Sequence, residues 1–213
     1  MEAERRQVTV LFADMVGFTS FSERSGEEAA FALMRSLWKL MAEAVREHGG
    51  VVQDFTGDGI MAVFGVPVAL EDGPLRASRA ALSILQRLNA SGPDLEAKHG
   101  TRPQMRIGLN TGLAVVGKID DHADGGGAVL GDTVNFAARL QSIAEPNTVF
   151  ISEATHRLVQ GLFDTPLSDV NMNWRCWSAA CLCIIDLAAD PGMGKSRVLH
   201  EFRRRITDAL GPY

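Results

Sequence analysis

The sequence contains little cysteine, and what it has is confined to one place. Its three cysteines, Cys176, Cys181 and Cys183, all fall in a single late segment of the 213-residue chain. Their spacing matches no zinc-binding or thioredoxin-like pattern. We therefore expect free thiols in a reducing compartment and predict a cytoplasmic protein rather than a disulfide-stabilised secreted one.

Long apolar runs and an excess of basic residues are also missing. The longest apolar stretch, residues 176–189, is interrupted by Asp186 and is shorter than the ~20 residues that span a bilayer. Residues 1–7 are charged and do not resemble a signal peptide. The formal net charge is -5, which disfavours a nucleic-acid partner but not a phosphate ligand, because local groups and metal ions govern such sites. We expect no membrane contact and no nucleic-acid binding.

Hydrophobic patterning predicts short strands mixed with helices of very different lengths. Residues 8–12 are rich in β-formers, and the spacing of apolar residues from Phe31 indicates a long helix ending near Gly49. Ser20 with Glu23, and Ser25 with Glu28, have the spacing of capping boxes. The remaining predicted elements are strands 51–55 and 60–64, helix 75–88, a loop over 89–103, a strand pair 105–109 and 114–118, a loop at 120–127, helix 132–144, strand 148–151 and helix 153–160. This order predicts an α+β fold, an antiparallel-rich sheet with helices packed on it, of the ferredoxin-like kind.

Two acidic residues are placed where strands turn. Asp14 ends the first predicted strand, and Asp58 lies between Gly57 and Gly59 in a predicted hairpin. If these strands are neighbours, the two carboxylates converge and can hold two divalent ions for phosphoryl chemistry. Because Asp is common in turns, the pattern is equally consistent with two structural turn residues.

Two further segments suggest phosphate and ribose contacts. The turn of Val16, Gly17, Phe18 and Thr19 precedes a helix and offers backbone N–H groups to a phosphate. Asn135 and Arg139 are four residues apart on a predicted helix, so they share one face. An arginine there can stabilise charge on a phosphoryl group, although a polar helix surface would give the same pair.

Taken together, four segments resemble the motifs of class III adenylate and guanylate cyclases. Residues 8–19 (VTVLFADMVGFT) are similar to the first strand and metal turn, and residues 55–65 (FTGDGIMAVFG) to the second metal hairpin. Residues 105–112 (MRIGLNTG) and 131–139 (GDTVNFAAR) resemble the two later motifs, in the family's order and spacing. The resemblance covers roughly residues 4–163 and implies cyclisation of a purine nucleoside triphosphate to a 3′,5′-cyclic monophosphate with release of pyrophosphate.

The resemblance also implies roles for individual residues. Asp14 and Asp58, with the carbonyl group of Met15, would bind two divalent ions, Mg²⁺ or Mn²⁺. The backbone of residues 16–19 and the side chain of Arg106 would contact the triphosphate. Asn135 would place the ribose, and Arg139 would stabilise charge on the α-phosphate.

In this family the site lies between two chains, one giving the acids and the other the Asn and Arg. Since this chain carries both sets, the resemblance implies a head-to-tail homodimer with shared sites and with ATP or GTP as substrate. The positions that select the base in the family are Asp54 and Ala128 here. Neither the adenylyl nor the guanylyl pair is reproduced. We expect ATP to be favoured, as in cyclases linked to ATPase domains, with GTP possible.

The C-terminal part departs from the family. We predict a catalytic domain over residues 1–167, followed at 168–213 by an atypical linker and the truncated start of a P-loop ATPase-like segment. Residues 190–196 resemble the P-loop, but Ala189 stands where its first glycine belongs. The two terminal strands of the family are not recognisable after Phe163. This favours an alternative function, a catalytically weak nucleotide-binding or dimerising signalling module.

Overall fold

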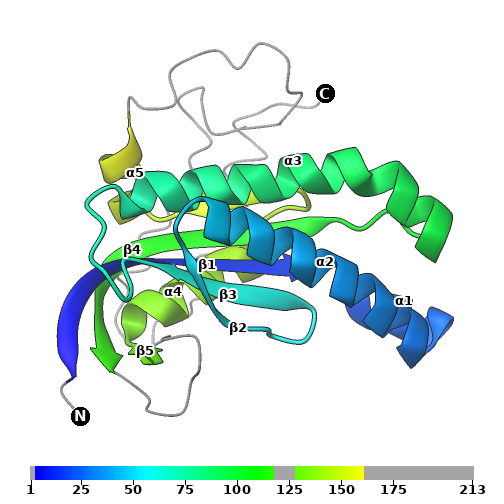
Figure 1. The fold of residues 1–213 in the computed structure, drawn as a ribbon, viewed down its shortest axis with the longest axis horizontal. Coiled ribbons are helices and arrows are strands. Elements are labelled where there is room, and N and C mark those ends of the chain that lie inside the picture. Colours follow the sequence, from blue (N-terminus) through cyan, green and yellow to red (C-terminus); the bar gives the residue numbers. More distant parts are fainter. Residues whose placement is uncertain (1–2, 118–127, 161–213) are drawn as a thin grey trace, which may run out of the picture.

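The computed structural model describes residues 3–117 and 128–160 of the chain (Figure 1). The predicted loop at 120–127, the cysteines, the P-loop-like segment and the predicted second unit at 168–213 lie outside the described residues. Within the described ranges, no helix is long and apolar enough to cross a membrane.

The centre of the fold is a six-stranded, mostly antiparallel sheet. Its strand order is β2-β3-β1-β4-β5, and β6 pairs with β4 in parallel. The bounds of the strands are β1 Glu4–Met15, β2 Val51–Asp54, β3 Gly59–Phe64, β4 Met105–Gly117, β5 Ala128–Leu130 and β6 Thr148–Ile151. Strand β1 lies between β3 and β4 and pairs antiparallel with both. The β-rich run near the N-terminus therefore becomes the central strand.

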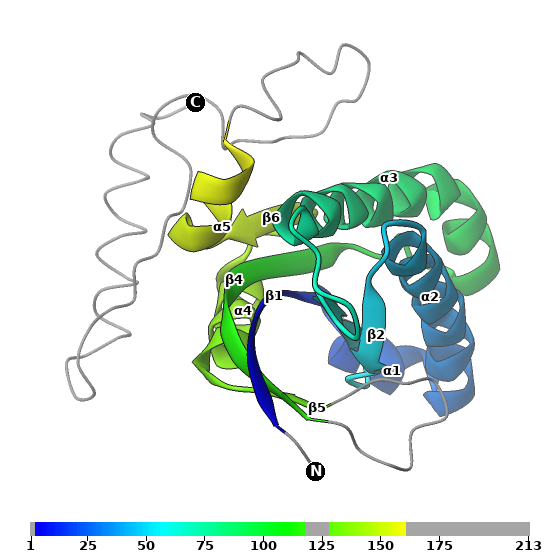
Figure 2. The ribbon, with the colours of Figure 1, turned by 60° about the vertical axis from the view of Figure 1, so that its left-hand side comes forward.

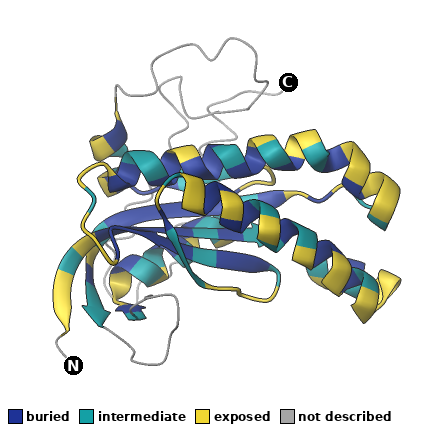
Figure 3. Cartoon of the chain, viewed as in Figure 1, coloured by how far each residue is buried: buried dark blue, intermediate teal, exposed yellow. Residues whose placement is uncertain are grey.

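Helices cover the sheet from both sides (Figure 2). Their bounds are α1 Phe18–Ser25, α2 Glu27–Glu47, α3 Gly73–His99, α4 Asp132–Ile143 and α5 Glu153–Val159. Helices α2 and α3 lie side by side and bury one face of the sheet, while α4 packs on β4 and β1 from the other face. The exposed residues of α2 and α3 face outward (Figure 3).

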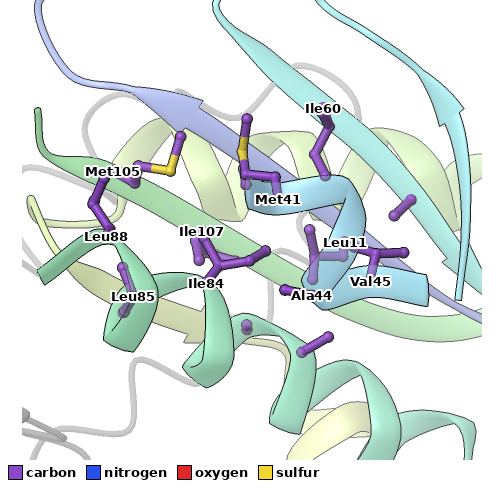
Figure 4. Close-up of a cluster of buried hydrophobic side chains, with 14 of the residues drawn as sticks. Leu11, Met41, Ala44, Val45, Ile60, Ile84, Leu85, Leu88, Met105 and Ile107 are labelled. Atoms are coloured by element: carbon purple, nitrogen blue, oxygen red, sulfur yellow. The ribbon is translucent and has the colours of Figure 1, made fainter. Parts of the chain in front are cut away.

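Because side chains alternate along a strand, β1 contributes to two cores. Leu11 and Ala13 join the larger core with residues of α2 and α3, such as Met41 and Ile84 (Figure 4). Val8 and Val10 point to the opposite face and pack in a second cluster that includes Ala137 of α4. Asp14 therefore emerges on the α4 face, in line with Val10 and Phe12.

The α+β class is confirmed, but three local predictions were wrong and the short strand β5 was not predicted. Residues 105–117 form one 13-residue strand rather than a strand pair, because Asn110 and Thr111 continue the ladder with β1. Helix α3 runs through the predicted loop, past Pro93, because Leu88 and Leu95 are both buried in the larger core. Neither α1 nor α2 has a side-chain cap; Gly17 and Gly26 occupy their N-cap positions.

Candidate active site

The two predicted metal acids meet at the end of β1. Asp14 is opposite Gly59 in the β1–β3 ladder, and the backbone N–H of Met15 donates to the carbonyl oxygen of Asp58 at 2.9 Å. This close approach requires glycine. A Cβ at position 59 would lie 2.1 Å from the carbonyl oxygen of Ala13, and Gly57 has a φ of +76°. The sequence Gly57-Asp58-Gly59 thus lets the hairpin bring its carboxyl against Asp14.

The proximity of the two acids changes the protonation of Asp14. Burial, a hydrogen bond that protonated Asp14 donates to Asp58, and the charge of Asp58 raise the pKa of Asp14 from 3.8 to about 7. Arg106 and a hydrogen bond from Gln141 act in the opposite direction but are the smaller effects. Without a cation, Asp14 beside a second carboxyl group therefore retains its proton up to near neutral pH.

This shift predicts a pH-dependent stability. Between about pH 4 and pH 7 the unfolded chain has lost the Asp14 proton while the folded chain retains it, so the free energy of unfolding falls as pH rises. In chelator-treated protein we expect the melting temperature of Asp14→Asn to fall less between pH 5 and pH 8 than that of the wild type. Thermal unfolding followed by circular dichroism measures the difference. Equal slopes for the two proteins would contradict the raised pKa.

The metal ligands predicted from the resemblance fit a divalent cation. Asp14 and Asp58 supply hard oxygen donors, and a bound cation would replace the proton that Asp14 retains. Among the described residues, no cluster of three or more His, Cys, Asp or Glu could hold a metal by itself. This agrees with magnesium sites in which one or two carboxylates act together with substrate phosphates. The carbonyl group of Met15 follows Asp14 directly and stays a predicted ligand.

The predicted phosphate turn lies beside these acids. Gly17 has a φ of +73° and begins α1, whose first N–H groups have no intrahelical partner. The N–H of Val16, however, donates to the carbonyl oxygen of Gln104 at 2.8 Å. Of the four predicted amides, those of Gly17, Phe18 and Thr19 are therefore the ones that a phosphate can use.

Arg106 is next to Asp14 across the β1–β4 ladder. Its Nη1 lies 3.5 Å from the carbonyl oxygen of Ser142, and its Nε is buried without a hydrogen-bond partner among the described residues. A buried guanidinium N–H without an acceptor is costly. The position and the unused donor both suit the predicted phosphate contact.

Asn135 and Arg139 do not join the acids of their own chain. Both are exposed on α4, whereas Thr133, Ala137 and Leu140 form its buried face. Because an α-helix turns by about 100° per residue, Asn135 and Arg139 point away from the sheet. The structure confirms that they share a helix face but leaves them apart from Asp14 and Asp58.

The two predicted base-selecting positions lie on strands at opposite ends of the strand order. Asp54 is exposed at the end of β2, and Ala128 is half-buried at the start of β5. Their role in base selection stays a prediction.

One residue that contacts the acids was not predicted from the sequence. Gln141, on α4, donates from Nε2 to Oδ2 of Asp14 at 3.2 Å. It follows Arg139 by two residues, and it is four residues after the buried Ala137, so helical spacing was the available signal. A glutamine on a helix flank gives no indication by itself of which strand it will reach.

A hollow of about 360 Å³ lies elsewhere, at the junction of β4, α4 and α5. It is lined by residues such as Asn110, Phe136 and Arg157, and none of the predicted site residues is among them. Asp14 and Asp58, both half-buried, do not line this hollow.

A sheet edge with two carboxylates, an arginine and an uncapped helix N-terminus defines a site of the kind used for phosphoryl chemistry. The family model described as the adenylate and guanylate cyclase catalytic domain matches residues 1–174. The chain therefore belongs to the family of adenylate and guanylate cyclase catalytic domains.

Individual relatives agree with this assignment. The chain is 34% identical over 141 residues to Adenylate cyclase 1 of Rhizobium meliloti (strain 1021), a match that covers 66% of this chain and 21% of that protein. The crystal structure of the guanylyl cyclase Cya2 is similar with a TM-score of 0.69 and 32% identity, over 74% of this chain and 80% of that one. The adenylyl cyclase CyaB from P. aeruginosa gives 0.68 and 29%, over 75% and 83%.

The match spans 21–25% of the length of three curated relatives. The neighbouring structures are cyclase catalytic domains, which confirms the predicted class III cyclase fold.

Proposed function

We propose that this chain cyclises a purine nucleoside triphosphate to its 3′,5′-cyclic monophosphate and pyrophosphate, with ATP favoured over GTP. The observation that carries the proposal is the convergence of Asp14 and Asp58 beside Arg106 and the start of α1. Both carboxylates are oxygen ligands for Mg²⁺ or Mn²⁺. When bound, the two ions would neutralise phosphate charge and lower the pKa of the attacking hydroxyl group.

The chain's own residues would bind and orient the triphosphate at this edge. The N–H groups of residues 17–19 point from a helix N-terminus, where anions are stabilised. Arg106 adds a fixed positive charge next to Asp14. These contacts hold the pyrophosphate leaving group, so that the bond between the α-phosphorus and the bridging oxygen lies opposite the attacking oxygen.

A second copy of the chain would complete the site. Asn135 and Arg139 are exposed on α4 and directed away from the acids of their own chain, so they are available to a partner. A head-to-tail homodimer places each half beside the complementary half of the other chain and forms two equivalent sites.

In the shared site, Asn135 would hold the ribose so that its 3′ oxygen faces the α-phosphorus. The 3′ oxygen loses its proton to solvent and forms a bond to phosphorus, and the bond to the pyrophosphate oxygen breaks. Arg139 would stabilise the charge that develops on the α-phosphate oxygens in the transition state. The partner's α4 thereby supplies positioning and electrostatic stabilisation, while the acids of the first chain hold the ions.

Turnover of ATP and GTP with Mg²⁺ or Mn²⁺, measured by chromatography of the products, tests the proposal directly. Formation of cyclic nucleotide and pyrophosphate in equal amounts supports it. Binding of nucleotide without turnover would favour instead the catalytically weak, dimerising module, for which the unmatched base-selecting pair is the supporting observation.

We expect weak base discrimination. The carboxylate of Asp54 can accept from guanine but faces the acceptor N1 of adenine unfavourably, and Ala128 offers no polar side chain. A site without a complementary partner discriminates little. The kcat/KM values for ATP and GTP should therefore agree within roughly a hundredfold, about 3 kcal/mol.

Asp54→Lys combined with Ala128→Asp should shift this preference toward ATP. Asp94→Lys, which repeats the Asp-to-Lys change of the first substitution at an exposed position of α3, should leave the preference unchanged. A wild-type enzyme with strong selectivity for ATP would show that Asp54 does not contact the base.

A further inference from the structure

Gln141 is the one residue of α4 that hydrogen-bonds a predicted metal ligand. Its Nε2 lies 3.2 Å from Oδ2 of Asp14, and its side chain is half-buried. The amide N–H donates to the carboxylate, so the contact remains possible whether Asp14 is ionised or binds a cation through its other oxygen. The contact joins residues 127 positions apart in the sequence.

The backbone of α4 packs so closely on β4 that the direction of the Gln141 side chain is fixed. At Gly108 of β4, an added Cβ would lie 2.3 Å from the backbone nitrogen of Gln141 and 2.5 Å from the carbonyl oxygen of Ala137. Helix α4 thus rests directly on the strand next to β1. The carbonyl oxygen of Ser142 also lies near Arg106, so the same turn of α4 contacts both neighbours of the phosphate site.

We propose that Gln141 is a positioning residue of the metal site, which holds the Asp14 carboxylate in a metal-binding orientation within its own chain. This inference rests on the proposed function. A carboxylate at a strand end retains rotation about two side-chain bonds, and a hydrogen bond to one oxygen restricts that rotation and leaves the other oxygen free for a cation. Groups that orient a metal ligand in this way affect metal affinity without touching the ion.

The residues of α4 would serve two different sites of the dimer. Asn135 and Arg139 point away from the sheet and would serve the partner's acids, whereas Gln141 reaches the acid of its own chain. One helix therefore contributes to two different sites of the dimer. Substitution of Gln141 should therefore impair only the site whose acids come from the same chain.

The first test measures metal affinity without catalysis. Mn²⁺ binding is followed by electron paramagnetic resonance in the presence of 3′-deoxy-ATP or 3′-deoxy-GTP, which lack the attacking hydroxyl group. Gln141→Met keeps the side-chain length and removes the donor, and we expect its Mn²⁺ Kd to rise about tenfold. Gln86→Met, the same change at an exposed position of α3, should leave the Kd unchanged.

Gln141→Asn serves as a second variant if Gln141→Met folds poorly, as judged by thermal unfolding. It retains the amide but withdraws it from Asp14, so it should also weaken Mn²⁺ binding. An Mn²⁺ Kd within twofold of wild type in a folded variant would overturn the proposal.

The second test uses heterodimers with a single working site. In a mixture of Asp14→Ala and Arg139→Ala chains, the working site takes its acids from the Arg139→Ala chain. Gln141→Met on that chain should raise the Mn²⁺ concentration needed for half-maximal turnover about tenfold. On the Asp14→Ala chain, the same substitution should have no effect on this concentration.

Equal effects on both chains would show that Gln141 acts by supporting α4 in general, which overturns the positioning role. The proposed function fails in a different way, because the parental mixture would then give no cyclic nucleotide at all.

Discussion

Asp14→Ala and Asp58→Ala should each abolish cyclisation, with kcat/KM reduced on the order of a thousandfold or more. Each substitution deletes one of the two carboxylates that meet at the end of β1. Neither carboxylate belongs to an apolar core, and Asp14 is held with a raised pKa at a cost in stability. The variants should therefore fold. Turnover of ATP and GTP with Mn²⁺, together with circular dichroism, provides the measurement.

Asp94→Ala is the matched control, since Asp94 is an exposed carboxylate on α3. It should retain wild-type turnover. If either Asp14→Ala or Asp58→Ala remains active with Mn²⁺ present, the two-metal assignment is wrong.

Mixing two inactive variants should restore activity. Arg139→Ala removes the group that would stabilise transition-state charge, and Asp14→Ala removes a metal ligand, yet one site of their heterodimer retains both. In a random 1:1 mixture half of the dimers are heterodimers with one intact site of two, so about a quarter of wild-type activity should return. Product formation by each variant alone and by the mixture measures the recovery.

The control mixes Asp14→Ala with Asp58→Ala. Both defects belong to the acidic half of the site, so each heterodimer site lacks one carboxylate and no recovery is expected. Chains with different affinity tags show whether heterodimers form. Tagged Asp14→Ala/Arg139→Ala heterodimers without activity would contradict a site shared between chains.

The errors in the predicted elements have a common physical origin. Asn110 and Thr111 resemble a turn, but Thr111 hydrogen-bonds Thr9 across the ladder at 3.0 Å, and the strand continues. Pro93 suggests a loop, but burial of Leu88 and Leu95 against the core extends α3 beyond it. In both places tertiary packing outweighed local propensity.

The amino-acid sequence by itself determined the family, the α+β class and most of the helices and strands, and it predicted the two acids. The turn motifs around Asp14 and Asp58 and the spacing of Asn135 and Arg139 are local patterns, which a chain displays without folding. The glycines on either side of Asp58 already indicate that this hairpin approaches a neighbouring strand closely.

Only the tertiary structure decided which of these residues meet. Strand pairing brings Asp58 and Arg106 to Asp14. It also aims Gln141 at Asp14 and leaves Asn135 and Arg139 facing outward. These contacts depend on strand order and helix packing, and they join residues up to 127 positions apart in the sequence. A local sequence pattern does not encode contacts over such a separation.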